Sequence, residues 1–384
     1  NTIFAGGVGG GIWKCTNFKS TNFTWTPVAN HLANLAVCAL VQDPTTPNTM
    51  YVGTGEGWGN FGAIVGNGIY KSIDGGVTWN VLSSTVNLAD FNYVQDLVIT
   101  NNGILFATTR SRFCNNGGGV QRSADGGVTW SRVIGTTGGS CEIVRDLNAA
   151  DLEIAPNGDV FVSTGLLGDT EARKGKLYKS AITNGANIGT IGTWVDITPT
   201  LTTGVTNWRR IEVSIAPNNS NIIYALCEKS IITINPDGTT TTRIVIGAIQ
   251  KSIDGGTTWT NMTLPSWCDQ GSTSTDFTRG QCWYDLIASV DPNNSNILFV
   301  GGVDMLKTTD GGTTWSQISQ WASGCGASIG NVHADIHNII HYPTSSNEII
   351  SANDGGIHYS ADGGTTWTAK NTNYNVTQFY SVAM

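Results

Sequence analysis

The amino-acid sequence predicts an all-β fold: a single seven-bladed β-propeller of four-stranded antiparallel blades. Two observations predict it, an octapeptide that recurs along the chain and a set of four short apolar runs in each repeat. The composition agrees, because charged residues make up only 12 % of the 384 residues and 48 are glycine. Coiled coils and helical bundles are far richer in charge, so the sequence excludes them.

The octapeptide Ser-x-Asp-Gly-Gly-x-Thr-Trp marks the repeats. It occurs at residues 72–79, 123–130, 252–259 and 360–367, and residues 308–315 differ from it only at the first position. Degraded copies end at Trp25 and Trp194. The closing tryptophans lie 51 to 65 residues apart: Trp25, Trp79, Trp130, Trp194, Trp259, Trp315 and Trp367. A period of this length indicates seven copies of one supersecondary unit.

Each repeat contains four strand signals, A to D. Strand A is an apolar run such as residues 211–216 or 286–290, and a turn rich in Pro, Asp and Asn ends it. Strand B follows, as at residues 222–226 and 297–301. Strand C leads into the octapeptide, and strand D leaves from its tryptophan. Four strands per repeat are typical of propeller blades.

The two ends of the chain complement each other. The chain begins at a strand B, residues 2–5, and finishes after the seventh tryptophan with a spare strand A, residues 378–384. We expect the C-terminal strand to join the N-terminal blade and close the ring, so that residues 1–384 form one domain.

Charge and hydropathy limit the partners. The net charge is −8 and no run of Lys or Arg occurs, so nucleic acid and anionic membrane surfaces are not expected partners. No apolar stretch reaches the roughly 18 residues of a membrane span. The chain opens on Asn1, as after removal of a signal peptide or excision of a domain. We expect a secreted or cell-surface domain that is monomeric.

The octapeptide aspartates have an expected structural role. Their carboxylates can accept hydrogen bonds from N–H groups of their own turns, and one carboxylate per turn is too few oxygens for calcium. These residues are Asp74, Asp125, Asp254, Asp310 and Asp362. The motif resembles the Asp-box, or BNR repeat, of sialidases, sortilin-type ectodomains and xyloglucan-active glycoside hydrolases. The run 333–337 also resembles secreted sortilin-like propellers.

Strand direction separates two ends of each blade. The A-to-B and C-to-D turns lie at one end and are short, whereas the B-to-C and D-to-A loops lie at the other and carry long insertions. Among these insertions are residues 55–66, 228–243, 263–281 and 320–332. Variable loops on a rigid scaffold are where binding sites usually occur, so we expect the site on this loop-rich face.

Aromatic and charged residues of these loops are the candidate ligand-binding groups. Aromatic rings beside carboxylates and guanidinium groups suit sugars, and they also suit protein partners. The candidates are Trp58, Trp208, Arg210, Trp267, Trp283, Tyr284 and Trp321. We expect a protein that binds a carbohydrate or a surface protein rather than an enzyme. A scaffold within a larger surface complex is a further possibility.

A glycoside hydrolase or lyase acting on a polysaccharide is the alternative. Such an enzyme needs two carboxylates about 5 to 10 Å apart, and Glu56, Asp285 and Asp335 are the candidates. Against this alternative, the resemblance to xyloglucan-active enzymes implies a cleft between two propellers, whereas this chain contains one.

Histidines and cysteines supply the remaining candidates. Period 2 along a strand puts His333, Asp335 and His337 on one side, a set that suits a divalent metal. Because a strand spreads these side chains over more than about 10 Å, we expect no cofactor. The eight cysteines contain no CxxC pair, which favours disulfides. Cys114 can pair with Cys141, and two of Cys268, Cys282 and Cys325 can pair, with Cys268 and Cys282 as the candidates.

Overall fold

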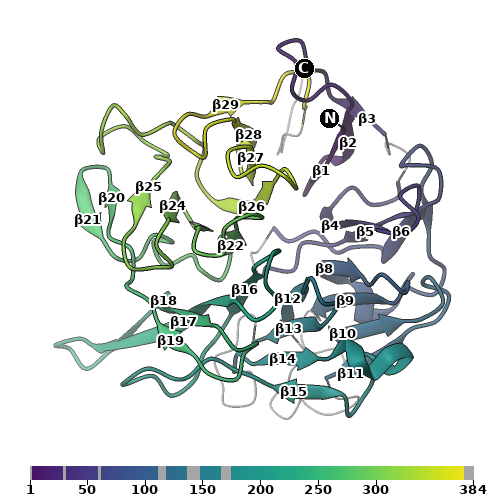
Figure 1. Ribbon diagram of the computed structural model, residues 1–384, viewed down its shortest axis with the longest axis horizontal. Helices are drawn as coiled ribbons and strands as arrows, with labels where there is room; N and C mark the ends of the chain where they lie inside the picture. The colour runs from purple at the N-terminus through teal and green to yellow at the C-terminus, as the bar shows by residue number, and fades with distance from the viewer. Residues whose placement is uncertain are drawn as a thin grey trace. The chain divides into compact units, whose positions relative to one another are not determined.

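The structure, a computed structural model, describes residues 2–28, 32–58, 62–110, 118–135, 148–165 and 174–375 (Figure 1). This part of the chain consists of strands and turns, with short 3-10 helices at η1 (Ala89–Phe91) and η3 (Ile182–Asn187). Within those ranges, no helix has the length and apolar character needed to cross a bilayer. The all-β prediction is confirmed.

Contacts divide the chain into two compact units. The first comprises residues 1–152, 189–191 and 370–384, and the second comprises residues 153–188 and 192–369. The first unit contains three antiparallel sheets, in the orders β1-β2-β3, β4-β5-β6-β7 and β8-β9-β10-β11. Their strands are β1 (Ile3–Gly7), β2 (Gly11–Cys15), β3 (Thr26–Pro27), β4 (Val37–Gln42), β5 (Met50–Thr54), β6 (Ile69–Ser72), β7 (Asn80–Val81), β8 (Tyr93–Ile99), β9 (Leu105–Arg110), β10 (Gly118–Ser123) and β11 (Ser131–Ile134).

Four more blades follow, each with four strands in sequence order. The first of them is β12 (Ala149–Ile154), β13 (Val160–Thr164), β14 (Leu177–Ser180) and β15 (Trp194–Asp196), and the boundary between the units passes through β12. The next is β16 (Ile211–Ile215), β17 (Ile223–Ile234), β18 (Thr240–Ser252) and β19 (Thr260–Asn261). The last two are β22 (Ile287–Val290), β23 (Leu298–Gly301), β24 (Met305–Thr308) and β25 (Ser316–Gln317), then β26 (Ile336–His341), β27 (Ile349–Asn353), β28 (Gly356–Ser360) and β29 (Thr368–Ala369).

Seven blades are therefore present, and six of them show the predicted A-to-D order among the described residues. The N-terminal sheet has three strands among the described residues. Its predicted fourth strand, residues 378–384, lies outside them, so closure of the ring by this strand stays a prediction, as does the single domain.

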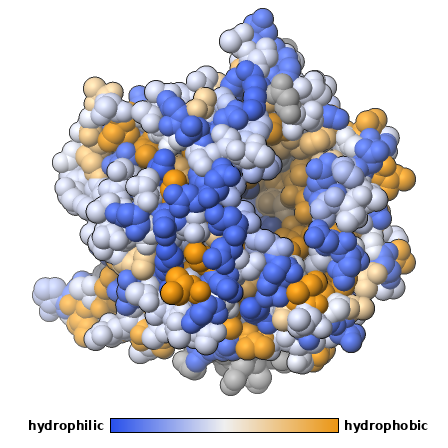
Figure 2. Space-filling model, in the orientation of Figure 1, coloured by the Kyte–Doolittle hydropathy of each residue, from blue (hydrophilic) through white to orange (hydrophobic). Residues whose placement is uncertain are grey.

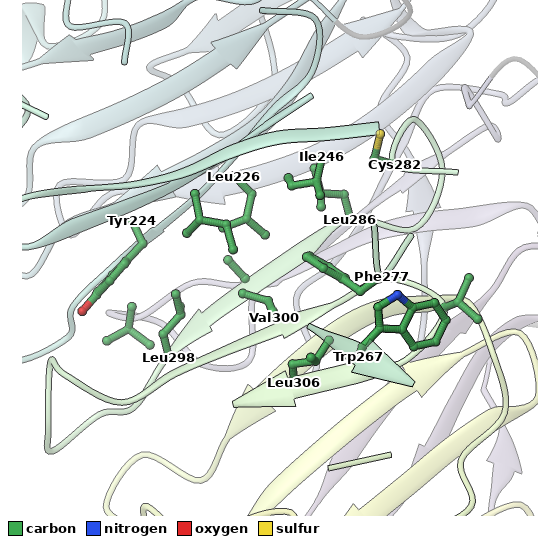
Figure 3. Close-up of a cluster of buried hydrophobic side chains, with 14 of the residues drawn as sticks. Tyr224, Leu226, Ile246, Trp267, Phe277, Cys282, Leu286, Leu298, Val300 and Leu306 are labelled. Atoms are coloured by element: carbon green, nitrogen blue, oxygen red, sulfur yellow. The ribbon is translucent and has the colours of Figure 1, made fainter. Parts of the chain in front are cut away.

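Apolar side chains of neighbouring blades form the core. Strands β5, β13 and β16 are buried along their whole length, as expected of strands covered on both faces. In the group shown in Figure 3, Leu226 of β17, Ile246 of β18 and Val300 of β23 meet Trp267 and Phe277 from the connection between two blades. The connection is thus part of the core.

The octapeptide turn closes on its own aspartate. In the first copy, Oδ1 of Asp74 accepts hydrogen bonds from the N–H groups of Val77 and Thr78 at 3.0 and 2.9 Å, and the Thr78 hydroxyl donates to Oδ2 at 2.6 Å. The hydroxyl and amide of Thr78 hold the pKa of Asp74 well below its usual value. Asp125, Asp254, Asp310 and Asp362 accept the same threonine bonds. Each of these carboxylates thus accepts hydrogen bonds within its own turn.

One predicted loop is a strand pair instead. Residues 228–243 were expected as a B-to-C insertion, but β17 and β18 continue through them and pair from Ile223 with Ser252 to Ile234 with Thr240. The reason is the β-branched composition of both arms, which favours extended backbone. A separate, short sheet of β20 (Trp267–Asp269) and β21 (Ser272–Ser274) lies in the connection that follows.

Candidate functional site

The candidate site lies at the beginning of two neighbouring first strands, β22 and β26, within the second unit. Asp285 precedes β22 and Asp335 precedes β26. Because the two strands pack beside each other and both aspartates come just before them, the fold brings these two predicted candidates together.

Asp285 and Asp335 form a carboxyl pair. Their side chains are within hydrogen-bonding reach of each other, and Asp285 is fully buried (0 % exposed). Among the residues described, neither oxygen of Asp285 has a donor of good geometry. Burial and the charge of Asp335 raise the pKa of Asp285 to about 10. Asp285 is therefore protonated at neutral pH and donates its proton toward Asp335.

Asp335 is held in an unusual conformation. Its φ of +63° is in the left-handed region, which is rare for residues other than glycine. Nε2 of Gln281 donates to its Oδ1 at 3.3 Å. Burial and the charge of Asp354 raise its pKa. Strain of this kind concentrates at functional sites, where the surrounding structure maintains it.

Asp354 is the third carboxylate, and its surroundings keep it charged. It follows β27, and its N–H donates to the carbonyl oxygen of Asp335 at 3.3 Å. Nε2 of His337 lies 2.8 Å from Oδ1, and the Tyr284 hydroxyl donates to the same atom at 3.1 Å. Burial alone raises the pKa of Asp354, but the bond and charge of His337 and the Tyr284 hydroxyl outweigh it and lower the pKa. Asp335 and Asp354 are thus joined through the backbone, and their pKa values are shifted in opposite directions.

Aromatic rings flank this cluster. The ring of Tyr284 stands edge-on to His337 with centroids 4.6 Å apart, and the ring of Trp283 lies 5.5 Å from that of Tyr284. Trp283 and Tyr284 are half-buried, and the side chain of Asp354 is 37 % exposed. Asp354 is therefore open to solvent beside partly exposed aromatic side chains. The face shown in Figure 2 carries hydrophobic residues only in small scattered groups, so no extended apolar patch marks a site there.

Three predicted ligand-binding residues are buried, and we correct their assignment. Trp208 is 1 % exposed, and its Nε1 donates to the carbonyl oxygen of Pro199 at 2.9 Å. Trp267 is 2 % exposed and belongs to the core of Figure 3. Arg210 is 4 % exposed and pairs with Glu212 at 2.8 Å. The loops that carry these residues fold back against the blades, so the side chains pack inward.

The other predicted residues differ in exposure. Glu56 and Trp58 belong to the first unit, where Glu56 is buried (5 % exposed) and Trp58 is half-buried. A pairing of Glu56 with either candidate aspartate stays untested. Trp321 is 37 % exposed in the second unit. The sequence did not predict sugar- or protein-binding roles for His333, His337 or Gln281. It singled out His333 and His337 only as metal ligands.

The metal alternative is not supported by the geometry. Within the described ranges, no group of three or more His, Cys, Asp or Glu side chains is placed to hold a metal ion. His337 is turned to Asp354, Nδ1 of His333 lies 3.2 Å from the carbonyl oxygen of Ala334, and Asp335 is turned to Asp285 and Gln281. The three side chains therefore have separate partners.

Cysteine pairing corrects one candidate. Cys268 forms a disulfide with Cys325, with Cα atoms 5.6 Å apart. Cys282 is a buried free thiol at the edge of the cluster in Figure 3. Cys114 and Cys141 lie outside the described residues, so their pairing stays a prediction.

Comparisons with known proteins give relatives but no family assignment. No known family profile matches the chain. The xyloglucanase Xgh74A of Acetivibrio thermocellus is 26 % identical over 256 residues, which are 58 % of this chain and 25 % of that protein. A xyloglucanase of Hypocrea jecorina is 28 % identical over 181 residues, 42 % of this chain and 19 % of that protein. The chain thus spans about a quarter or less of the length of these curated relatives.

Solved structures with the same fold include enzymes and surface proteins. An ancestral GH74 enzyme superposes with a TM-score of 0.62 at 17 % identity, covering 96 % of this chain and 44 % of that one. PorZ, an essential surface component of the type-IX secretion system of Porphyromonas gingivalis, gives 0.53 at 13 % identity, covering 95 % and 46 %. These likenesses establish the fold. The chain is an all-β, seven-bladed propeller, and its sequence relatives include xyloglucanases.

Proposed function

We propose that this chain is the propeller portion of a secreted or cell-surface glycoside hydrolase that acts on a polysaccharide such as xyloglucan. The observation that carries the proposal is the backbone hydrogen bond and electrostatic interaction between Asp335, whose pKa is raised, and Asp354, whose pKa is lowered. Two carboxyl groups whose surroundings separate their pKa values can act as an acid and a base at one pH. The xyloglucanase relatives support the choice of substrate.

Each carboxyl group has a distinct role in this proposal. Asp335 protonates the glycosidic oxygen as the sugar leaves, and Asp354 activates water or attacks the anomeric carbon. Asp285 is too deeply buried to reach a sugar, so it acts on Asp335 as a positioning residue that supplies a hydrogen bond. Trp283 and Tyr284 offer ring faces and a hydroxyl to the sugar.

Binding of a polysaccharide without cleavage is the second candidate. The contact between Asp285 and Asp335 counts against these two as the catalytic pair, since the catalytic carboxyl groups of glycosidases are about 5 to 10 Å apart, so hydrolysis depends on Asp354 as the second group. In the binding candidate the same aromatic and carboxylate groups recognise the sugar, and no bond is broken. A surface protein as the ligand of this face belongs to the same candidate.

One experiment separates the candidates. The chain is incubated with xyloglucan, new reducing ends are counted, and binding is measured in parallel by affinity gel electrophoresis. If the chain hydrolyses xyloglucan, the wild type should produce new reducing ends. Their number should fall at least about a hundredfold in Asp335→Asn and Asp354→Asn. The control is Asp237→Asn, an exposed aspartate of the β17–β18 turn, which should cleave at the wild-type rate. Retardation without new ends supports the binding candidate, and the absence of both rules out both candidates for this polysaccharide.

A further inference from the structure

Two long connections of the second unit are joined covalently. The disulfide between Cys268 and Cys325 links the connection that leads to β22 with the connection that leads to β26. Trp321 lies in the second connection and is 37 % exposed, the only tryptophan among the exposed large hydrophobic residues of the described chain. Its surroundings therefore need an explanation of their own.

Hydrogen bonds to the backbone of Trp321 and from the side chain of Gln320 fix the backbone around Trp321. The buried carboxylate of Asp304 accepts its backbone N–H. The preceding residue, Gln320, donates from Nε2 to the carbonyl oxygens of Gly326 and Ile329 at 3.0 and 2.9 Å. Its Oε1 accepts the N–H of Cys325 at 3.3 Å. The ring is thus presented on a fixed backbone, which lowers the entropy lost when a ligand binds.

Arg279 is positioned over this ring by a strained backbone. Its φ is +52°, in the left-handed region that residues other than glycine rarely adopt. Its guanidinium group lies 5.4 Å from the centre of the Trp321 ring, and its Nε lies 3.1 Å from Oδ2 of Asp269. The side chains of Arg279 and Asp269 are 45 % and 20 % exposed. An exposed arginine would not need this strain for solvation alone, so the backbone favours this particular placement.

We propose that Trp321, Arg279 and Asp269 form a second carbohydrate-binding subsite that takes an uncharged hexopyranose unit. The exposed part of the Trp321 ring contacts the apolar C–H face of the sugar. The remaining N–H groups of Arg279 donate to ring hydroxyls, and the carboxylate of Asp269 accepts from them. Because Asp269 already balances the charge of Arg279, the site has no surplus charge for an acidic sugar.

This inference rests on the proposed function, since the subsite would hold a unit of the same polysaccharide away from the carboxyl cluster. It also gives the disulfide a role. Cys268 is next to Asp269, and Cys325 is four residues after Trp321, so the bridge fixes the distance between the acceptor and the ring.

The test measures binding in the Asp335→Asn background, where cleavage cannot consume the ligand. The affinity of the whole chain for xyloglucan is compared with that of Trp321→Ala and Arg279→Ala by affinity gel electrophoresis. We expect each to weaken binding about three- to tenfold, and Trp321→Tyr to retain most of it. Ser328→Ala, an exposed change in the same connection, should bind as the parent does. Near-ultraviolet circular dichroism confirms that every variant is folded.

Three outcomes would overturn the inference: unchanged binding in a folded Trp321→Ala, no binding of xyloglucan by the parent, or tighter binding of polygalacturonate than of xyloglucan. Failure of the proposed hydrolysis is distinguishable from these. If wild-type protein produces no reducing ends while Trp321→Ala still weakens binding, the subsite is supported and the proposed hydrolysis is contradicted. If wild-type protein cleaves and Trp321→Ala keeps both its KM and its affinity, the subsite alone is wrong.

Discussion

The Nη2 atom of Arg210 donates a 2.7 Å hydrogen bond to the carbonyl oxygen of Leu286, 76 residues further along the chain. Its Nη1 also donates to the carbonyl oxygens of Cys282 and Tyr284, at 3.3 Å each. Arg210 therefore holds the segment that carries Tyr284 and Asp285, although it does not reach the solvent itself.

Removal of this guanidinium group should cost stability. In Arg210→Met, the partner carboxylate of Glu212, 4 % exposed, loses its ion pair and three carbonyl groups lose a donor. Breaking a buried pair by removing one partner typically costs about 3 to 5 kcal/mol. Urea unfolding measures the loss. Arg243→Ala, at an exposed position of β18, should change stability by less than about 0.5 kcal/mol. Equal stability of the two variants would contradict the role of Arg210.

Ionisation of Asp285 should make stability depend on pH. Burial and the charge of Asp335 raise its pKa to about 10, so the folded chain keeps a proton that the unfolded chain releases above about pH 4. Between these values the unfolded state binds fewer protons, and stability falls as pH rises, by up to about 1.4 kcal/mol per pH unit. Asp285→Asn cannot ionise and should flatten this slope between pH 5 and pH 8 in urea unfolding. An unchanged slope would mean that Asp285 is already ionised in the folded protein.

Gly312 lies in the fourth octapeptide turn along the chain. Gly312→Ala should destabilise the fold by more than the backbone strain of its positive φ. Gly312 has a φ of +93°, and an added Cβ would lie 2.6 Å from Sδ of Met262. Gly238 has a φ of +82° with no atom within 4 Å of the same position, so Gly238→Ala isolates the backbone strain. We expect about 1 to 2 kcal/mol for Gly238→Ala and about 1 to 3 kcal/mol more for Gly312→Ala. Thermal unfolding of both variants compares them, and equal losses would exclude the contact with Met262.

Loss of the disulfide should lower stability by about 2 to 4 kcal/mol, because it closes a loop between residues 57 apart in sequence. Cys325→Ser tests this by urea unfolding, with Ser328→Ala as the control in the same connection. Peptide mapping of the oxidised protein should recover Cys268 bonded to Cys325. Recovery of Cys268 bonded to Cys282 would contradict the structure.

The repeat could be predicted from the sequence because its interactions are local. The turn at Asp74 is completed by Ser72 and Thr78, which lie within the same octapeptide, so a short motif determines the geometry wherever it recurs. Strand alternation and turn residues then account for the order of strands within each blade. The same local reasoning placed Asp285 just before a first strand, but it put His333 and Asp335 inside the next one, which begins only at Ile336 because Asp335 has a φ of +63° that extended backbone does not allow.

Only the tertiary structure decided which side chains meet and which are buried. Asp285 and Asp335 are 50 positions apart in sequence, and their contact arises because β22 and β26 pack as neighbouring first strands. The sequence predicts Trp208 and Trp267 as surface residues of their loops. Their exposure depends on blades elsewhere in the chain, however, and those blades bury them. The sequence by itself therefore determined the seven blades and their turns, which depend on contacts within a few residues. The carboxyl cluster, the cysteine pairing and the choice between exposed and buried tryptophans depend on packing between distant segments.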